Sequence, residues 1–230
     1  MKTNLIKHPL LMALVAAVTA ITARAQLSTN LLQNANGQTG NMSGWTAVAS
    51  GGNGWHVGTD YGGAMTGSSN AFMTSYGWDV RSQTIDLLAD GFTTAQLDSA
   101  PTISISDWVH GYFATGDYFM NVQLENASHN VIASWSQGSQ SSPLTIAPSA
   151  GWTDVTGSLQ NYGSGVRYIV FEDGGKDTLG WLGYYGAAFD ASSVTLMIQP
   201  VPEPTALALA GLGALSLLLF RRRNNPIHYN

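Results

Sequence analysis

The sequence predicts one all-β domain in residues 26–200, built as an antiparallel sandwich of two sheets. Apolar and polar residues alternate along several short runs, which is the period of a half-buried strand. Glycine-rich turns separate these runs, and no long apolar stripe with helical spacing interrupts them. A segment of about 175 residues is large enough to bury a single hydrophobic core.

Five alternating runs mark the clearest expected strands. In an antiparallel sheet, the residues of a run that share one face point into the core. The run 166–171 is apolar on nearly both faces, so we expect it to be a central strand. The residues that share a face are, strand by strand, Ile103 and Ile105; Met120, Val122 and Leu124; Val131, Ala133 and Trp135; Val166, Tyr168 and Val170; and Val194, Leu196 and Ile198.

The segments between these runs carry turn residues. The polar stretch 126–130 has the length of a hairpin loop between its two flanking strands. Glycine-rich turns are expected at 51–54, 62–63, 163–165 and 173–175.

Composition excludes several classes of function. The 230 residues contain no Cys, which excludes disulfides, zinc–thiolate and iron–sulfur sites, and thiol nucleophiles. Residues 26–200 hold only three basic residues, Arg81, Arg167 and Lys176, against thirteen acidic ones, a balance of −10. A nucleic-acid-binding surface needs clustered basic residues to neutralise phosphates. We therefore expect no nucleic-acid partner.

The N-terminus has the pattern of a secretory signal. Two lysines precede the apolar run 10–21, and a small-x-small site follows at 23–25. This pattern predicts a signal peptide over 1–25, cleaved between Ala25 and Gln26. An uncleaved membrane anchor is the alternative, and the shortness of the apolar run disfavours it.

The C-terminal residues 201–230 form a second signal. Val201, Pro202, Glu203 and Pro204 precede the apolar run 205–220, and Arg221, Arg222 and Arg223 follow it. A helix over 205–220 would be roughly 24 Å long, a little short of a bilayer core, and its arginines would stay in the cytoplasm. The segment resembles the bacterial PEP-CTERM sorting signal. The resemblance implies a single transmembrane helix at 205–220, processing by an exosortase-type protease, and a place in the envelope or on the surface of a Gram-negative cell.

A search for reactive groups finds no catalytic motif. The sequence has no Gly-x-Ser-x-Gly elbow, no His-Glu-x-x-His and no phosphate-binding glycine loop. Glu125 and Glu172 are the only glutamates of the domain, and we interpret Glu125 as solvated surface rather than half of a glycosidase pair. The stretch 173–177 offers two carboxylates to calcium, but a plain turn is the simpler interpretation. We expect no cofactor, no metal and no enzymatic activity.

The most informative residue is Trp181, in the glycine-rich stretch 177–186. Three glycines within seven residues disfavour a regular buried strand there. Proteins hold sugars with stacked aromatic rings and short polar groups, so a loop Trp is a candidate sugar anchor. Inward packing of the indole is the alternative.

A second resemblance covers most of the domain. Seven stretches are similar, in order, to the F-box-associated domain of sugar-recognising F-box proteins. The resemblance implies a jelly-roll-like, galactose-binding-like sandwich of two antiparallel sheets. The stretches are 51–57; 74–78 with 83–91; 107–111; 130–133; 151–152 with 161–168; 171–177; and 181–186.

The resemblance also implies a site. Glycan binders of that family hold the chitobiose core of N-linked sugars between two loops, which correspond here to Tyr76 and to Gly180, Trp181 and Leu182. The family has Tyr-Trp-Lys where this chain has Gly-Trp-Leu, so one stacking face and one donor are lost. F-box helices are missing, so we expect no ubiquitin-ligase partner.

Three function classes remain open on the sequence. They are a surface-anchored, non-catalytic carbohydrate- or glycoprotein-binding module, a structural matrix or exopolysaccharide-associated protein without a defined small ligand, and a glycan-active enzyme. An exposed Trp181 with Tyr76 in stacking reach favours the first, and an inward-packed Trp181 favours the second.

Overall fold

A computed structural model describes residues 25–60, 64, 69–111 and 113–199, together with 211, 213, 214 and 216. Gln26–Ile198 forms one compact unit, and the two terminal segments are grouped in a second. The predicted signal peptide before Ala25, the motif 201–204, most of the apolar run 205–220 and the arginines 221–223 lie outside the described residues. No helix within the described part of the chain is long and apolar enough to span a membrane.

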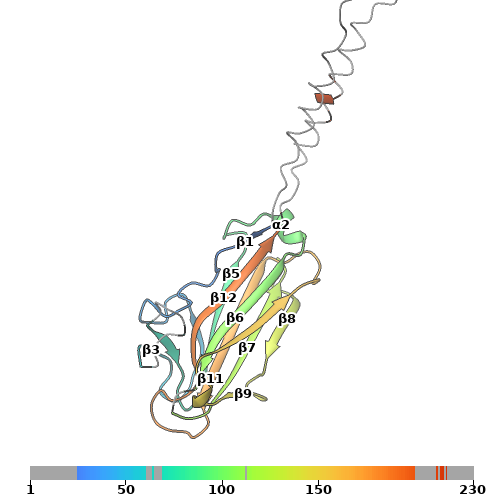
Figure 1. The fold of residues 1–230 in the computed structure, drawn as a ribbon. Coiled ribbons are helices and arrows are strands. Elements are labelled where there is room, and N and C mark those ends of the chain that lie inside the picture. The colour runs from blue at the N-terminus through green and yellow to red at the C-terminus, as the bar shows by residue number, and fades with distance from the viewer. Residues whose placement is uncertain are drawn as a thin grey trace, which may run out of the picture. The chain divides into compact units, whose positions relative to one another are not determined.

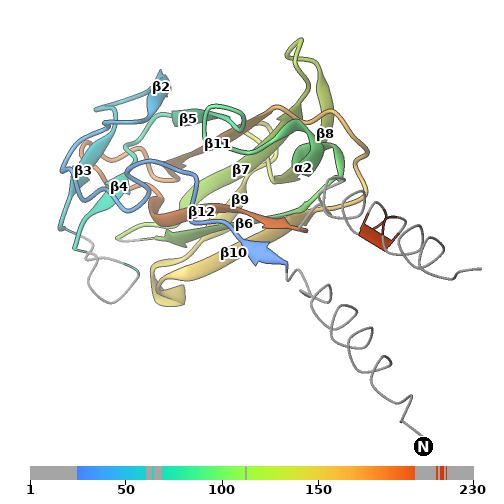
Figure 2. The same cartoon turned by 90° about the horizontal axis from the view of Figure 1, so that it is seen from above.

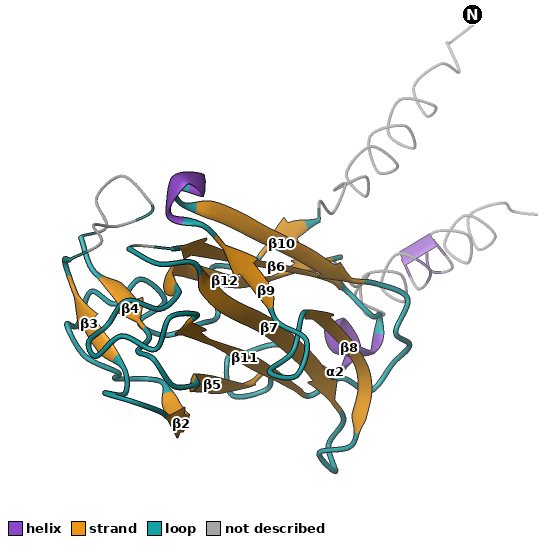
Figure 3. Ribbon diagram, turned by 90° about the horizontal axis from the view of Figure 1, so that it is seen from below, coloured by secondary structure: helices purple, strands orange, loops and turns teal. Residues whose placement is uncertain are grey.

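The unit Gln26–Ile198 is a sandwich of two antiparallel sheets, as the sequence predicted (Figures 1 and 2). The first sheet has the order β10 (Thr153–Leu159), β6 (Thr102–His110), β12 (Ala188–Ile198), β4 (Ala71–Met73) and β3 (His56–Gly58), with β1 (Gln26–Leu27) also paired to β12. The second has the order β2 (Thr46–Ser50), β5 (Asp79–Asp86), β11 (Tyr168–Asp177), β7 (Gly116–Glu125) and β8 (Val131–Gln137), with β9 (Leu144–Ile146) also paired to β7. Short helical segments are α2 (Thr94–Asp98) and the 3-10 turn η1 (Pro148–Ala150), as Figure 3 shows by colour.

The core lies between the sheets and is lined by the predicted alternating residues. Ile103 and Ile105 of β6 and Val194 of β12 are buried on one side. Met120 and Val122 of β7 are buried on the other. β11 lies between β5 and β7 and pairs with both, which confirms the expected central strand.

Two strands differ from their predicted faces. In β11, Ile169 and Phe171 are fully buried, whereas Tyr168 and Val170 are only partly buried.

The second such strand is β8. Val131 of β8 was expected to point inward with Ala133 and Trp135, but its side chain is 52% exposed, whereas Ile132 packs against the core. A register shift beside Glu125 explains the difference, because β8 carries one residue more than β7 at this point. The bulge reverses the alternation for the first residue of the strand.

The predicted turn at 173–175 is wrong, and so is the calcium alternative at 173–177. These residues form the second half of β11, which pairs with β7 as far as Asp177 and with β5 as far as Gly175. Glycine is required there by close packing, since a Cβ on Gly174 would lie 2.7 Å from the Asp79 carbonyl oxygen. The Asp173 carboxylate points into the core and binds Arg81, so it is not a calcium ligand.

A buried polar cluster joins the two sheets. The Arg81 guanidinium donates to both Asp173 oxygens at 2.7–3.0 Å and to the Ser192 hydroxyl at 2.9 Å. The Ser192 hydroxyl donates in turn to Asp107, which lies with Ser192 in the first sheet, opposite the sheet of Arg81 and Asp173. Burial, and next the nearby negative charge of Asp173, raise the pKa of Asp107 well above its usual range. These effects favour the neutral form of Asp107, which binds its proton more tightly than an exposed carboxyl group does.

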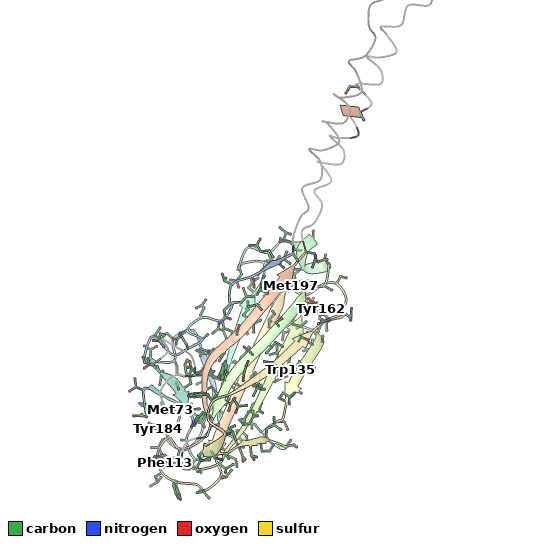
Figure 4. All side chains as sticks on the ribbon, in the orientation of Figure 1. Met73, Phe113, Trp135, Tyr162, Tyr184 and Met197 are labelled. Atoms are coloured by element: carbon green, nitrogen blue, oxygen red, sulfur yellow. The ribbon has the colours of Figure 1, made fainter. Side chains whose placement is uncertain are left out.

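The long strands give the sandwich two distinct ends. β12 runs from the loop after β11 to the C-terminal boundary of the domain, where it pairs with β1. Figure 4 places Phe113 and Tyr184 at one end and Met197 at the other. Loops 51–54, 74–78 and 178–186 lie at the first end, and the two chain termini of the domain lie at the second (Figure 1).

Candidate functional site

The loop 178–186, which connects β11 to β12, is organised around one buried carboxylate. Asp177, the last residue of β11, is 2% exposed. Its Oδ1 accepts hydrogen bonds from the amides of Leu179, at 2.9 Å, and Gly180, while its Oδ2 accepts from the Trp181 amide at 3.1 Å. Gly180 has a φ of +73°, a left-handed conformation that glycine adopts without strain. The carboxylate therefore fixes the turn that presents Trp181.

Further hydrogen bonds attach this loop to its neighbours. The Thr178 amide and hydroxyl both donate to the Thr115 carbonyl, at 3.1 and 2.8 Å. The Gly183 amide donates to the Asn53 side chain at 3.2 Å, which ties the loop to 51–54. The loop thus has polar attachments on both sides of Trp181.

Ser75 connects all three loops at this end. Its carbonyl accepts from the Asp177 amide, its hydroxyl donates to the Gly51 carbonyl, and the same hydroxyl accepts from the Asn53 amide. Its own amide donates to Asp79 Oδ2 at 2.7 Å. Burial raises the pKa of Asp79 to about 6, although the hydrogen bonds from Ser75 oppose this effect.

A shallow, solvent-open depression of about 560 Å³ lies on the outer side of the Trp181 loop. Phe113, Gly180, Trp181, Leu182 and Tyr185 line it. Trp181 is 49% exposed and Leu182 is 78% exposed. The Tyr185 ring meets Trp181 and Phe113 edge-on, with centroid distances of 6.2 and 5.7 Å. The result is an apolar, largely aromatic surface without a charged lining residue.

The structure brings together three of the four predicted glycan-site residues. Gly180, Trp181 and Leu182 share the depression, whereas Tyr76 does not line it. Tyr76 lies half-buried in the neighbouring loop, where its ring packs over Gly52, on which a Cβ would come within 2.9 Å of two ring carbons. Sequence reasoning missed Phe113 and Tyr185. Both are aromatic residues in glycine-bounded loops, the same signal that singled out Trp181.

The other candidate groups do not form a reactive site. Glu125, considered for catalysis, lies 2.9 Å from Nδ1 of His129 in the hairpin, and the His129 ring stacks on Tyr168. Among the described residues, no three His, Asp or Glu side chains gather in a way that could hold a metal ion.

Comparison with protein families gives two matches. The F-box associated region matches residues 22–196. The chain belongs to this family. The match confirms the resemblance drawn from the seven motifs, and the PEP-CTERM protein-sorting motif matches residues 200–223.

Curated members of the F-box associated family are similar over most of this chain. F-box only protein 6 of Rattus norvegicus is 34% identical over 187 residues, which cover 77% of this chain and 64% of the relative. F-box only protein 2 of Bos taurus is 35% identical over 173 residues, with coverage of 72% and 58%. The chain thus spans about three-fifths of the length of these relatives.

Solved structures similar to this F-box associated domain have low sequence identity. A structure described as TmCBM61 in complex with β-1,4-galactotriose is 14% identical with a TM-score of 0.46, and it covers 73% of this chain and 98% of its own. The CBM22-1 xylan-binding domain of Xyn10C from Paenibacillus barcinonensis is 13% identical with a TM-score of 0.43, and the coverage is 73% and 93%.

Proposed function

We propose that the protein is an exported, surface-anchored module that binds a carbohydrate or glycoprotein without catalysis, and that Trp181 is its anchor. The observation that carries the proposal is a half-exposed indole on a loop whose backbone is fixed by a buried carboxylate. A preorganised loop loses little conformational freedom when a ligand binds. A flat, exposed aromatic ring is suited to the apolar C–H face of a sugar ring.

In this proposal the remaining site residues surround Trp181. Gly180 provides the left-handed turn and Leu182 extends the apolar surface, whereas Tyr76 lies outside this surface, half-buried in the neighbouring loop. The Tyr185 ring meets the indole edge-on, and Phe113 in turn meets Tyr185. The site is thus a one-sided aromatic platform, with weaker contacts than a site that retains the family's Tyr and Lys.

The proposal for export and anchoring rests on the two terminal signals. Cleavage between Ala25 and Gln26 would release the domain 26–200 outside the inner membrane. The PEP-CTERM match supports recognition of the motif 201–204 by an exosortase-type protease. Residues 205–220 would then form the single transmembrane helix, with Arg221–Arg223 on the cytoplasmic side. In this scheme the domain acts outside the inner membrane and has no ubiquitin-ligase partner.

A glycan array tests the binding proposal. The mature chain, purified in mild detergent, is applied to an array of N-glycans and bacterial polysaccharide fragments, beside the Trp181→Ala variant. Binding to a defined set of glycans, lost in the variant, supports the proposal. Absence of binding to every glycan, or binding that the variant retains, overturns it and favours the structural matrix role.

A further inference from the structure

The two carboxylate oxygens of Asp177 accept hydrogen bonds from different backbone amides of the Trp181 loop. Oδ1 accepts from the Leu179 and Gly180 amides, and Oδ2 alone accepts from the Trp181 amide. Three successive amides that converge on one point form a concave site that attracts an anion. Here the chain's own carboxylate, 2% exposed, fills that position.

The surroundings supply no positive charge to a ligand. The lining residues of the depression are uncharged. Lys176, the neighbour of Asp177 in the sequence, lies 3.6 Å from the Asp117 carboxylate and 5.5 Å from the Trp78 ring centroid. Residues 26–200 carry three basic against thirteen acidic groups. An anionic sugar would meet unfavourable charge without a compensating donor.

We propose that Asp177 is the positioning residue of this site: its carboxylate orders the Trp181 loop and, by occupying the loop amides, restricts the site to uncharged saccharides. The inference rests on the proposed glycan-binding function, but its first part concerns the free protein. Ligand contact remains with Trp181 and its neighbours, while Asp177 acts through the loop backbone.

The substitution Asp177→Asn distinguishes the contributions of the two carboxylate oxygens. An amide keeps one oxygen for the Leu179 and Gly180 amides but presents an NH₂ group to the Trp181 amide. Amide hydrogen exchange at 179–181, followed by NMR in the full chain, reports loop order without any ligand. We expect exchange at Trp181 to rise about tenfold, since a hydrogen bond to a charged group is lost. Asp154→Asn, the same change on an exposed strand position, is the matched control and leaves these amides unchanged.

Binding is measured with galactotriose and diacetylchitobiose as neutral probes and trigalacturonate as an anionic probe. We expect the wild type to bind a neutral probe and to reject trigalacturonate. Asp177→Asn weakens neutral binding about tenfold without a large change in melting temperature. In a Trp181→Ala background the same change has no further effect, because the anchor that Asp177 positions is already gone.

Several outcomes overturn the inference. Unchanged exchange at the three amides in Asp177→Asn removes the positioning role. Trigalacturonate bound as tightly as galactotriose removes the restriction to uncharged sugars. If the wild type binds none of the three probes but binds an anionic glycan on the array, glycan binding stands and the charge argument falls. If the protein also binds no glycan on the array, the proposed function is wrong. The hydrogen-exchange measurement still tests whether Asp177 orders the Trp181 loop.

Discussion

Because the Trp181 ring is half-exposed, its removal should affect ligand affinity much more than protein stability. Trp181→Ala removes an indole that is 49% exposed, so the melting temperature should shift by only a few degrees. Affinity for a glycan ligand should fall about thirtyfold, since an aromatic anchor typically contributes about 2 kcal/mol. Thermal melts and titration calorimetry measure both quantities.

Trp45→Ala is the control for this prediction, because Trp45 is 7% exposed and packs between Phe72 and Phe171. Emptying that site should cost about 3–5 kcal/mol. A large loss of stability in Trp181→Ala, with unchanged affinity, would contradict the anchoring role.

Asp79 gives the protein a pH-dependent stability. Burial raises its pKa from 3.8 to about 6, so the folded protein holds this proton more tightly than the unfolded chain. The free energy of unfolding should therefore fall as pH rises from about 4 to 6, by up to about 3 kcal/mol, and the Asp79 contribution should then level off. The free energy of unfolding of Asp79→Asn should not show this decrease, so the stability of the variant relative to the wild type should increase as pH rises. Urea unfolding at about pH 4 and about pH 7.5 measures the difference.

Exposed Asp60 provides the comparison for Asp79. Asp60→Asn should retain the wild-type decrease between these two pH values. If Asp79→Asn shows the same decrease as the wild type, Asp79 does not titrate in this range.

Individual site residues were predictable only where a local signal existed. The glycine-rich context of Trp181 and the family resemblance identified Gly180, Trp181 and Leu182 before the structure. Phe113 and Tyr185 were missed because they meet only when the loop after β6 folds against the loop after β11. The role of Asp177 was missed because its three bonds go to backbone amides, which leave no side-chain pattern in the sequence.

Among the elements, strands with strict alternation were predicted well and irregular ones were not. β6 alternates along its length, and β7 and β12 alternate over 120–124 and 194–198, so the buried faces of these stretches followed from the sequence. The second half of β11 was misread because Gly174 and Gly175 suggest a turn, whereas here they allow close strand packing. Helix α2 was not predicted, although Thr93 and Gln96 form a capping box at its N-terminus.

The buried cluster between β5, β11, β6 and β12 predicts unequal effects for its two carboxyl groups. Asp173→Asn removes the charge opposite Arg81 and should cost about 3–5 kcal/mol. Burial and the charge of Asp173 raise the pKa of Asp107 and so favour its neutral form. Asp107→Asn should therefore cost about 1 kcal/mol or less. Chemical denaturation of the two variants at neutral pH compares them, and equal losses would show that Asp107 is ionised.

At the scale of the whole molecule, the domain should fold without its terminal segments. Both segments lie outside the compact unit Gln26–Ile198. A fragment of residues 26–200 should be a soluble monomer with a β-type circular-dichroism spectrum, and it should remain in the soluble fraction. The full chain should sediment with membranes, because 205–220 is apolar and ends in three arginines. Equal partitioning of both would argue against an anchor, and a helix-dominated spectrum would argue against an independent β domain.

The course of β12 also determines how the domain would carry a mechanical load. The strand starts two residues after the Trp181 loop and ends at Ile198, just before the sorting motif. In a chain tethered at its C-terminus, tension from a captured ligand would run along this strand. Its hydrogen bonds to β6 on one side and to β4 and β1 on the other lie across the direction of pull. A force along the strand loads all these hydrogen bonds at once instead of breaking them one after another. The domain would therefore resist unfolding when fluid flow pulls on its ligand.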